Sequence, residues 1–354
     1  SNIVPLHTMM LKSASLYGVV QCWTTEAGVS QGINSEELGS LSKLGCGTTL
    51  SLVQALVKGG SSTVPRLWLV TNGAQAVPDN HPVIPGVAQS SVWGMGKVIS
   101  LEHPELNCTR IDLDPEETLE RQADALFKEI WSEDREDQVA WRGDSRYVAR
   151  LVGSRHREAV AQQADGETQK PLSFRSEASY LITGGMGGLG LLVANWMVSK
   201  GAKHLVLLGR RSPDDAAIKK ITELEMAGAS VVVEKADVSD GESMRGVWQR
   251  IEESNRPLGG VIHSAGMLSD GVLQNQSWSS FEQVMAPKVQ GAWHLHQLSL
   301  NQSLDFFVLF SSAASLLGSP GQGNHSSANA FLDGLAHYRR TMGLPGLSIH
   351  WGVV

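Results

Sequence analysis

The sequence predicts an α/β protein made of two doubly wound parallel sheets, of which the first is truncated. Two patterns predict this: strand-like and helix-like segments alternate through both halves, and a polar stretch over residues 153–177 separates them. The length agrees, because 354 residues exceed one ordinary domain and fit two. We therefore expect a first subdomain over 1–152, a linker over 153–177 and a second subdomain over 178–354.

The first half alternates strands and helices, with fewer units than the second half. Strands are expected at Leu16–Trp23, Leu67–Thr71 and Cys108–Leu113, helices at Thr48–Val57, Gln89–Glu102 and Pro115–Trp131, and a closing hairpin that turns at Gly143-Asp144. Because the rhythm matches that of the second half, the first half is interpreted as a degraded duplicate, although no repeat of fixed period is detectable.

The second half alternates more regularly and predicts a six-stranded doubly wound sheet. Its expected strands are Tyr180–Thr183, His204–Leu208, Ser230–Lys235, Gly260–His263, Asp305–Ser311 and Gly346–His350. Its expected helices are Gly188–Ser199, Asp215–Ala227, Glu242–Glu253, Ser280–Leu298 and Ser326–Met342.

Composition excludes several classes of function. A net charge of −7 and a pI near 5.9 argue against binding nucleic acid or an anionic membrane through bulk charge. No apolar run reaches the roughly 18 residues of a membrane span, and the start, Ser1–Pro5, lacks the features of a signal peptide. We expect a cytoplasmic protein and, without coiled-coil heptads at either end, a monomer.

The cysteines and histidines do not indicate a metal site. Cys22, Cys46 and Cys108 are odd in number, lie far apart and never form CxxC, so neither a disulfide framework nor zinc is expected. Histidines such as His263, His294, His296 and His350 are interpreted as structural or exposed.

A glycine-rich turn follows the first strand of the second half. Gly185, Gly187 and Gly190 form GxGxxG between a strand and an apolar helix, the context in which this pattern binds a dinucleotide in Rossmann-like sheets. Glycines let the backbone approach a pyrophosphate, and the helix start offers free N–H groups and a positive dipole end. A turn needed only for packing is the alternative. The expected cradle comprises Thr183, Gly184, Gly185, Gly187, Gly188, Leu189 and Gly190.

Later strand ends supply further cofactor candidates. Arg210 and Arg211 stand where NAD-specific sheets carry an acid, which favours the 2′-phosphate of NADPH; a solvated surface charge is the alternative for each. Asp237 and Val238 are placed to meet the adenine, and Ser264, Ala265 and Gly266 to lie along the nicotinamide ribose. The first half has only Asn72–Ala76 at the matching turn, so we expect it to bind no nucleotide.

These motifs together carry a resemblance to a known family. With TGGMGGLG, LLGRRS, ADVSD, HSAGML and FSSAASLLGSPGQGN in order, the second half resembles the ketoreductase domain of modular polyketide synthases, a branch of the short-chain dehydrogenases/reductases. The first half resembles that family's truncated structural subdomain. The resemblance implies NADPH-dependent reduction of a β-ketoacyl thioester held on an acyl carrier protein, beside neighbouring synthase domains.

The resemblance also implies a catalytic set, with one departure. Ser312 matches the family's serine, Lys288 its lysine and Asn329 its asparagine. Taken alone, Ser312 would equally fit a turn cap, Lys288 a surface charge and Asn329 a helix bend. The tyrosine slot, thirteen residues after Ser312 and four before Asn329, holds His325.

His325 leaves three functions open. Positioned acid catalysis typically supplies about 10²- to 10⁴-fold in rate, and the Lys288 ammonium would disfavour a protonated imidazole. Because imidazole is also shorter than phenol, we expect a strongly weakened or silent reductase. The alternatives are an active reductase with a histidine donor, a silent NADPH-binding scaffold, and an isomerase-like remnant that uses His325 as a base at the α-carbon.

Stereochemistry and substrate closure are also implied by the resemblance. The residues expected at the substrate side are Asp270, Leu317, Pro320, Gln322 and Asn324. Asp270, Pro320 and Asn324 match the B-type pattern, and Leu317 replaces the A-type tryptophan, so a D-hydroxy product is expected. The family usually continues past the point where this sequence ends, Trp351–Val354, into a substrate-covering segment, without which the pocket would be unroofed.

Overall fold

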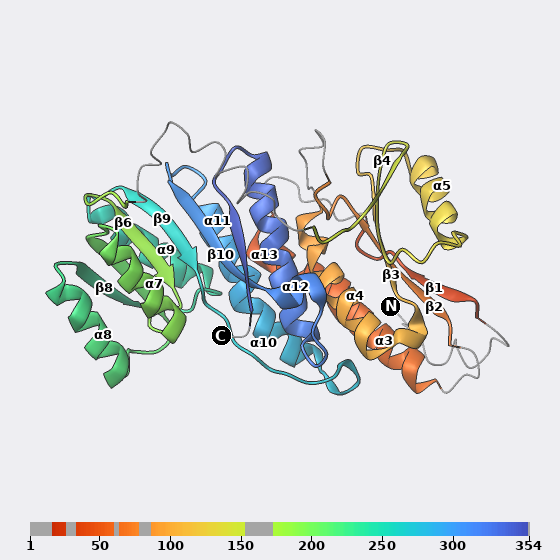
Figure 1. Ribbon diagram of the computed structural model, residues 1–354, viewed down its shortest axis with the longest axis horizontal. Coiled ribbons are helices and arrows are strands. Elements are labelled where there is room, and N and C mark those ends of the chain that lie inside the picture. The colour runs from red at the N-terminus through yellow and green to blue at the C-terminus, as the bar shows by residue number, and fades with distance from the viewer. Residues whose placement is uncertain (1–15, 26–32, 60–63, 78–85, 153–172, 353–354) are drawn as a thin grey trace.

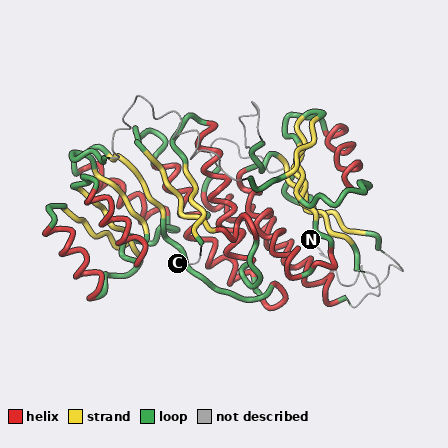
Figure 2. Tube along the Cα trace, viewed as in Figure 1, coloured by secondary structure: helices red, strands yellow, loops and turns green. Residues whose placement is uncertain are grey.

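The fold places two parallel-sheet α/β subdomains end to end, as the sequence predicts. The computed structural model describes residues 16–25, 33–59, 64–77, 86–152 and 173–352, so the first fifteen residues, most of the expected linker and Val353-Val354 lie outside the described residues. Figure 2 shows the two sheets separated by a layer of helices. None of the described helices has the length and apolar composition that a membrane crossing requires.

The first sheet has five strands in chain order, β1-β2-β3-β4-β5, with β5 antiparallel to β4. The strands are β1 (Gly18–Gln21), β2 (Arg66–Asn72), β3 (Thr109–Leu113), β4 (Gln138–Arg142) and β5 (Ser145–Val148). The helices are α2 (Ser35–Ser42), a π-turn at Lys43–Gly47, α3 (Thr48–Lys58), α4 (Ser90–Glu102) and α5 (Leu119–Ile130). This order does not reverse, so the first sheet has no switch point among its described strands.

Alternate residues of the first sheet face opposite helix layers. Trp68, Val70 and Ile111 pack against α5, whereas Leu67 and Leu69 belong to the main core with α3 and α4. The sheet is therefore covered on both faces, which accounts for its nearly continuous apolar strands.

The second sheet has six parallel strands in the order β11-β10-β9-β6-β7-β8. They are β6 (Ser179–Thr183), β7 (His204–Gly209), β8 (Ser230–Lys235), β9 (Leu258–His263), β10 (Phe306–Ser312) and β11 (Leu347–Trp351). The helices are α7 (Gly188–Ser199), α8 (Asp215–Met226), α9 (Gly241–Glu253), α10 (Trp278–Lys288), α11 (Gln290–Leu298), α12 (Ala313–Leu317) and α13 (Gly323–Thr341). The order reverses between β6 and β9, and ligands bind doubly wound sheets at such a switch point.

The single helix expected over Ser280–Leu298 is wrong. The chain forms α10 and α11 instead, with a break at Val289, and α10 begins earlier, after the N-cap Ser277. Pro287 lies inside α10, and a proline lacks an N–H and clashes with the preceding turn, which disfavours one uninterrupted helix here. Lys288 consequently stands at a helix end.

The region around His325 also differs from the expectation. The short helix α12 was not predicted, and α13 begins at Gly323 rather than Ser326. His325 therefore lies in the first turn of α13.

The two subdomains meet where α4 packs against α13, side by side in Figure 1. The backbones approach closely, because a Cβ on Gly94 would lie 2.2 Å from the carbonyl oxygen of Ser326, and one on Gly334 would lie 2.4 Å from Ser90 Oγ. One apolar core runs through both subdomains. Phe174, assigned to the linker from the sequence, packs against Tyr180 and Phe306 of the second subdomain.

Candidate active site

The turn after β6 brings backbone against backbone. Gly184 has φ +66°, and a Cβ on it would lie 2.9 Å from the nitrogen of Ala265. A Cβ on Gly190 would lie 2.4 Å from the carbonyl oxygen of Gly184, and one on Gly185 would lie 2.7 Å from that of Ile182. These three positions require glycine, since no side chain fits at such distances. A Cβ on Gly188 would meet nothing within 4 Å.

The start of α7 differs from the starts of its neighbours. Asp214 caps α8 by accepting from the Ala217 nitrogen at 2.9 Å, and Asp240 caps α9 in the same way. The N-cap of α7 is Gly187, which has no side chain to offer. Its first N–H groups therefore remain available to an anion at the positive end of the helix dipole.

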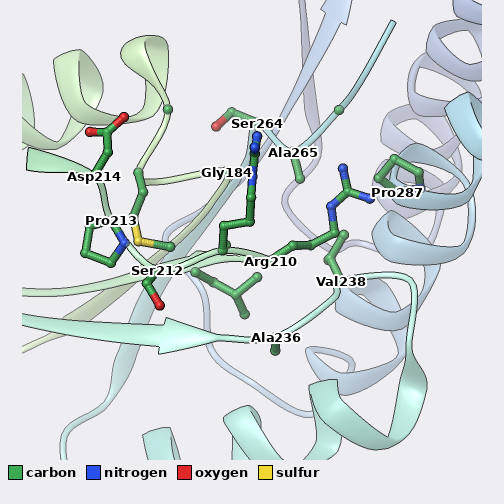
Figure 3. A pocket seen from close by; sticks show the side chains of 16 residues that line it. Gly184, Arg210, Ser212, Pro213, Asp214, Ala236, Val238, Ser264, Ala265 and Pro287 are labelled. Carbon is green, nitrogen blue, oxygen red and sulfur yellow. The ribbon is translucent and has the colours of Figure 1, made fainter. Parts of the chain in front are cut away.

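A cavity of about 480 Å³ opens beside this turn, at the carboxyl ends of the strands around the switch point (Figure 3). Eight of the expected cofactor residues line it: Gly184, Gly187, Arg210, Arg211, Val238, Ser264, Ala265 and Gly266. Six do not: Thr183, Gly185, Gly188, Leu189, Gly190 and Asp237. Ala236, which was expected beside Asp237 and Val238 at the adenine, also lines the cavity. The sequence reasoning did not assign Met186, Leu208, Gly209, Ser212, Pro213, Asp214 and Pro287, which neighbour the motif residues in the chain.

The two arginines of the cavity wall are exposed and uncompensated. Neither Arg210 nor Arg211 forms an ion pair with any residue that the structure describes. Figure 3 shows Arg210 near Val238 and Ala236. Asp237 follows β8 in the next turn, where its carboxylate accepts from the nitrogen and hydroxyl of Ser239.

Residues behind the cavity fix the strand ends. Thr183 Oγ1 and His263 Nδ1 lie 2.7 Å apart, joining β6 to β9, and both side chains are fully buried. Burial, aided by the charge of Lys288, lowers the pKa of His263 to about 3, so the imidazole is neutral. Ser264 Oγ donates to the carbonyl of Thr183 at 2.7 Å. Thr183 thus shapes the turn from behind.

The structure brings the four expected catalytic residues to one end of β10 and α13. Ser312 is the last residue of β10 and the N-cap of α12, accepting from the Ala314 nitrogen at 3.2 Å. Asn329 is fully buried and donates to the carbonyl of His325 at 2.8 Å. Ser312 therefore also fills the cap role that the sequence left open as an alternative.

Lys288 is a buried charge rather than a surface one. Its side chain is 6% exposed, and Nζ donates to the carbonyl of Phe310 at 2.9 Å. Burial lowers the pKa of Lys288 to about 8, and the negative charge of Asp333 opposes the shift. The ammonium form therefore predominates at neutral pH.

His325 is half-buried and neutral. Burial first, and then the charge of Lys288, lowers its pKa to about 4, while the charge of Asp270 opposes this. The sequence argument attributed the neutral imidazole to the charge of Lys288 alone, but desolvation is the larger cause of the lowered pKa. Nδ1 has no hydrogen-bond partner among the described residues, and the backbone N–H donates to Asn324 Oδ1 at 2.7 Å.

The substrate-side residues form a small polar cluster next to His325. Gln322 Nε2 donates to Asp270 Oδ2 at 3.2 Å, and Asn324 Nδ2 donates to the carbonyl of Ser269 at 2.7 Å. Leu317 is 64% exposed at the end of α12. Pro320 follows in the exposed turn that leads to α13.

Asp333 was not found from the sequence. Its carboxylate accepts from Ser315 and Ser348, and its Oδ1 lies 3.0 Å from His350 Nε2. Although burial raises its pKa, these partners bring the pKa of Asp333 below its ordinary value. The buried negative charge then acts on Lys288. A lone aspartate inside a helix pattern gives no signal of this role.

In the first sheet, the edge that corresponds to the cavity of the second sheet holds a carboxylate of the chain itself. Asp112 is fully buried; it accepts from the nitrogens of Ala74 and Gln75 at 2.8 and 3.0 Å and from Thr71 Oγ1 at 2.6 Å. Arg142 pairs with it at 2.6 Å. The N–H groups of Ala74 and Gln75, which follow β2, thus donate within the chain. That this half binds no nucleotide stays a prediction.

Two family models match the chain. Residues 178–354 match the model described as KR domain. Residues 15–151 match the model described as "Polyketide synthase extender module SpnB, Rossmann fold domain". The division between the two models falls within the polar stretch of the sequence.

Curated relatives are much longer than this chain. One polypeptide of the phenolphthiocerol/phthiocerol polyketide synthase of Mycobacterium tuberculosis is 39% identical over 303 residues, which is 85% of this chain and 16% of that protein. Polyketide synthase GfsB of Streptomyces halstedii is 37% identical over 318 residues, which is 87% of this chain and 6% of that protein.

Solved structures share the fold across nearly the whole chain. A structure titled "Structure of A-type Ketoreductases from Modular Polyketide Synthase" superposes with a TM-score of 0.83 at 33% identity, covering 98% of this chain and 70% of the other. The first ketoreductase of the tylosin polyketide synthase superposes with a TM-score of 0.70 at 33% identity, covering 91% and 72%.

Proposed function

Because this chain belongs to the ketoreductase-domain family of polyketide synthases, we propose that it binds NADPH and is built to reduce a β-ketoacyl thioester to the D-hydroxy product. The observation that carries this proposal is the juxtaposition of the uncapped α7 start with two arginines on one cavity wall that form no ion pair with any described residue. We further propose that His325 keeps the rate of reduction low.

The cavity fits a dinucleotide with a 2′-phosphate. Gly184 and Gly190 let the turn pack tightly against the chain's own backbone, and a Cβ on Gly188 at the start of α7 would meet nothing within 4 Å. A diphosphate can therefore approach the N–H groups of α7. Arg210 and Arg211, without carboxylate partners among the described residues, offer planar guanidinium donors. The acid of the same loop, Asp214, accepts from the Ala217 nitrogen as the cap of α8. This donor set favours NADPH over NADH.

The bound cofactor supplies a hydride to the ketone carbon, and the chain must stabilise the oxygen. The Ser312 hydroxyl accepts from Ala314, so its hydrogen is free to donate to the ketone oxygen. The Lys288 ammonium, held at the carbonyl of Phe310, contributes a positive charge close to the same place. Both groups favour negative charge on that oxygen.

Protonation of the ketone oxygen is the step for which the chain lacks a strong acid. With a pKa of about 4, roughly one His325 imidazole in 10³ is protonated at pH 7. A neutral imidazole N–H donates a hydrogen bond but is a very weak acid, whereas acid catalysis typically contributes about 10²- to 10⁴-fold. We therefore expect cofactor binding with slow turnover.

The proposed product stereochemistry rests on two residues of the same site. Asp270 and Gln322 are hydrogen-bonded to each other beside His325, and we propose that this pair selects the side on which the thioester enters, giving the D-alcohol.

Since the relatives are polyketide synthases of which this chain matches a minor part, we propose an acyl carrier protein as the substrate carrier and other synthase domains as neighbours.

Titration and turnover together test the proposal. NADPH fluorescence should saturate with a lower Kd than NADH, and a model β-ketothioester should be reduced slowly, with D-alcohol as the product by chiral chromatography. Absence of saturable NADPH binding would refute the cofactor proposal. A rate typical of tyrosine-containing reductases would refute the proposed impairment by His325.

The isomerase-like function can be distinguished from reduction with the same β-ketothioester. If His325 served as a base, solvent deuterium would enter the α-position of the thioester without NADPH consumption. A pKa of about 4 makes His325 a weak base, so we expect no exchange above the uncatalysed background.

A further inference from the structure

Two loops of the second subdomain meet next to the candidate active site. The Gly271 nitrogen donates to the carbonyl of Gly321 at 2.7 Å, and Gly271 also forms an isolated bridge with Gln322. One loop carries Asp270 and the other leads into the α13 turn that holds His325. Their mutual position therefore sets the geometry of the substrate side.

A side chain from the first subdomain holds both loops. Glu102 is the last residue of α4, and its Oε1 accepts from the Gly321 nitrogen at 2.7 Å. Its Oε2 accepts from the Leu273 nitrogen, also at 2.7 Å. One carboxylate thus uses one oxygen for each loop, and hydrogen bonds to an ionised acceptor are among the stronger ones in proteins.

The helix that carries Glu102 is itself firmly anchored. Lys97, one turn earlier, donates through Nζ to the carbonyl of Ser315 at 2.7 Å. Gly94 packs its backbone against Ser326 of α13. Since α4 cannot shift without disturbing these contacts, the position of the carboxylate is fixed by the first subdomain.

A second side chain of the first subdomain reaches the same loop. Gln54 Nε2, from α3, donates to the carbonyls of Leu273 and Gln276, each at 2.8 Å. Gln276 in turn donates to the carbonyls of Ser269 and Gly271, on either side of Asp270. The loop is therefore held at several points by polar groups.

The two loops hold residues that interact with or adjoin His325. Asp270 lies between these anchored carbonyls, accepts from Gln322 and acts electrostatically on His325. Asn324, which precedes His325, donates to the carbonyl of Ser269. Movement of either loop would therefore shift Asp270 relative to His325.

We propose that Glu102 is a positioning residue through which the nucleotide-free first subdomain sets the substrate side of the cleft. This assignment of a substrate side rests on the proposed function. The first subdomain then contributes to substrate recognition without touching the cofactor, and the loss of Glu102 should affect the thioester but leave NADPH binding unchanged.

Amide hydrogen exchange and NMR test the contact in the intact chain. In Glu102→Ala, the Leu273 and Gly321 amides should exchange at least tenfold faster, and the ring signals of His325 should shift. In Glu102→Gln, which keeps the shape but only one acceptor oxygen, one amide should remain protected. The control is Glu120→Gln, an exposed carboxylate in the first turn of α5, which should leave all these signals unchanged.

Binding measurements separate positioning from general structural damage. We expect the Kd of a β-ketothioester to rise at least tenfold in Glu102→Ala while the Kd of NADPH stays within twofold. Unchanged exchange at both amides, unmoved His325 signals, or equal loss of both affinities would overturn the proposal. If the unmodified chain bound no thioester, the proposed function would fail, whereas exchange and the His325 signals would still decide the role of Glu102.

Discussion

The Lys288 ammonium donates a hydrogen bond of 2.9 Å to the backbone carbonyl of Phe310, two residues before Ser312. This contact ties the end of α10 to β10 and holds a buried positive charge near the start of α13. The sequence places the two residues 22 positions apart, and Lys288 is the last residue of α10.

Removal of the Lys288 charge should raise the pKa of His325. Burial is the larger cause of the shift and remains in Lys288→Met, so the pKa should move above about 4 but stay below its ordinary 6.5. NMR titration of the imidazole measures this, with the exposed Lys220→Met as the control. A pKa that stays the same or falls would contradict the assigned electrostatics.

Restoration of a phenol at position 325 should increase the rate of reduction. In His325→Tyr, we expect NADPH oxidation with a β-ketothioester to rise about 10²-fold or more, because a positioned acid is then present beside Lys288. The matched control is His325→Phe, which supplies the ring without the hydroxyl. Equal rates for the two variants would show that another defect limits turnover.

Loss of both cavity arginines should remove the preference for NADPH. Hydrogen bonds to charged groups contribute about 1.5–3 kcal/mol, so Arg210→Ala with Arg211→Ala should weaken NADPH binding by about 10²-fold or more. NADH, which lacks the 2′-phosphate, should bind with nearly unchanged affinity. Fluorescence titration of both cofactors measures the ratio, with the double variant Lys219→Ala and Lys220→Ala on α8 as a control for the loss of two positive charges. A parallel loss for both cofactors would argue against a 2′-phosphate contact.

The glycine turn should tolerate a methyl group at one position and not at another. In Gly190→Ala, the added Cβ would lie 2.4 Å from the Gly184 oxygen, so we expect a loss of about 1–3 kcal/mol in unfolding free energy together with loss of NADPH binding. In Gly188→Ala, the Cβ meets nothing within 4 Å, and the unfolding free energy should be unchanged or slightly higher. Urea unfolding compares the two; similar destabilisation of both would contradict the described packing.

Stability should fall as the pH drops below 6.5. Burial lowers the pKa of His263 and His296 to about 3 and that of His325 to about 4, so the unfolded chain binds more protons between these values and 6.5. At pH 5, His263 alone should cost about 2 kcal/mol. Urea unfolding at pH 7.5 and 5 measures the effect, and His325→Tyr should flatten the profile. Greater stability at pH 5 would contradict buried neutral histidines.

Much of the fold was predictable from local patterns. The strand that starts at Ser230 and the helix that starts at Gly188 match their expected ranges, because apolar periodicity and glycine turns are properties of neighbouring residues. Where a nearby proline competed with that periodicity, as at Pro287, the expected single helix was wrong. The interpretation of Ser312, Lys288, His325 and Asn329 rested on the family resemblance, which motifs visible in the sequence carry.

The sequence by itself determined the α/β class, the glycine turn and the presence of a histidine in the tyrosine slot. Only the tertiary structure decided that desolvation is the main reason why His325 stays neutral, that Asp112 fills the edge of the first sheet, and that Glu102 reaches two loops 171 and 219 residues further along the chain. Burial and long-range hydrogen bonds depend on which surfaces pack together, and the local sequence pattern does not predict that packing.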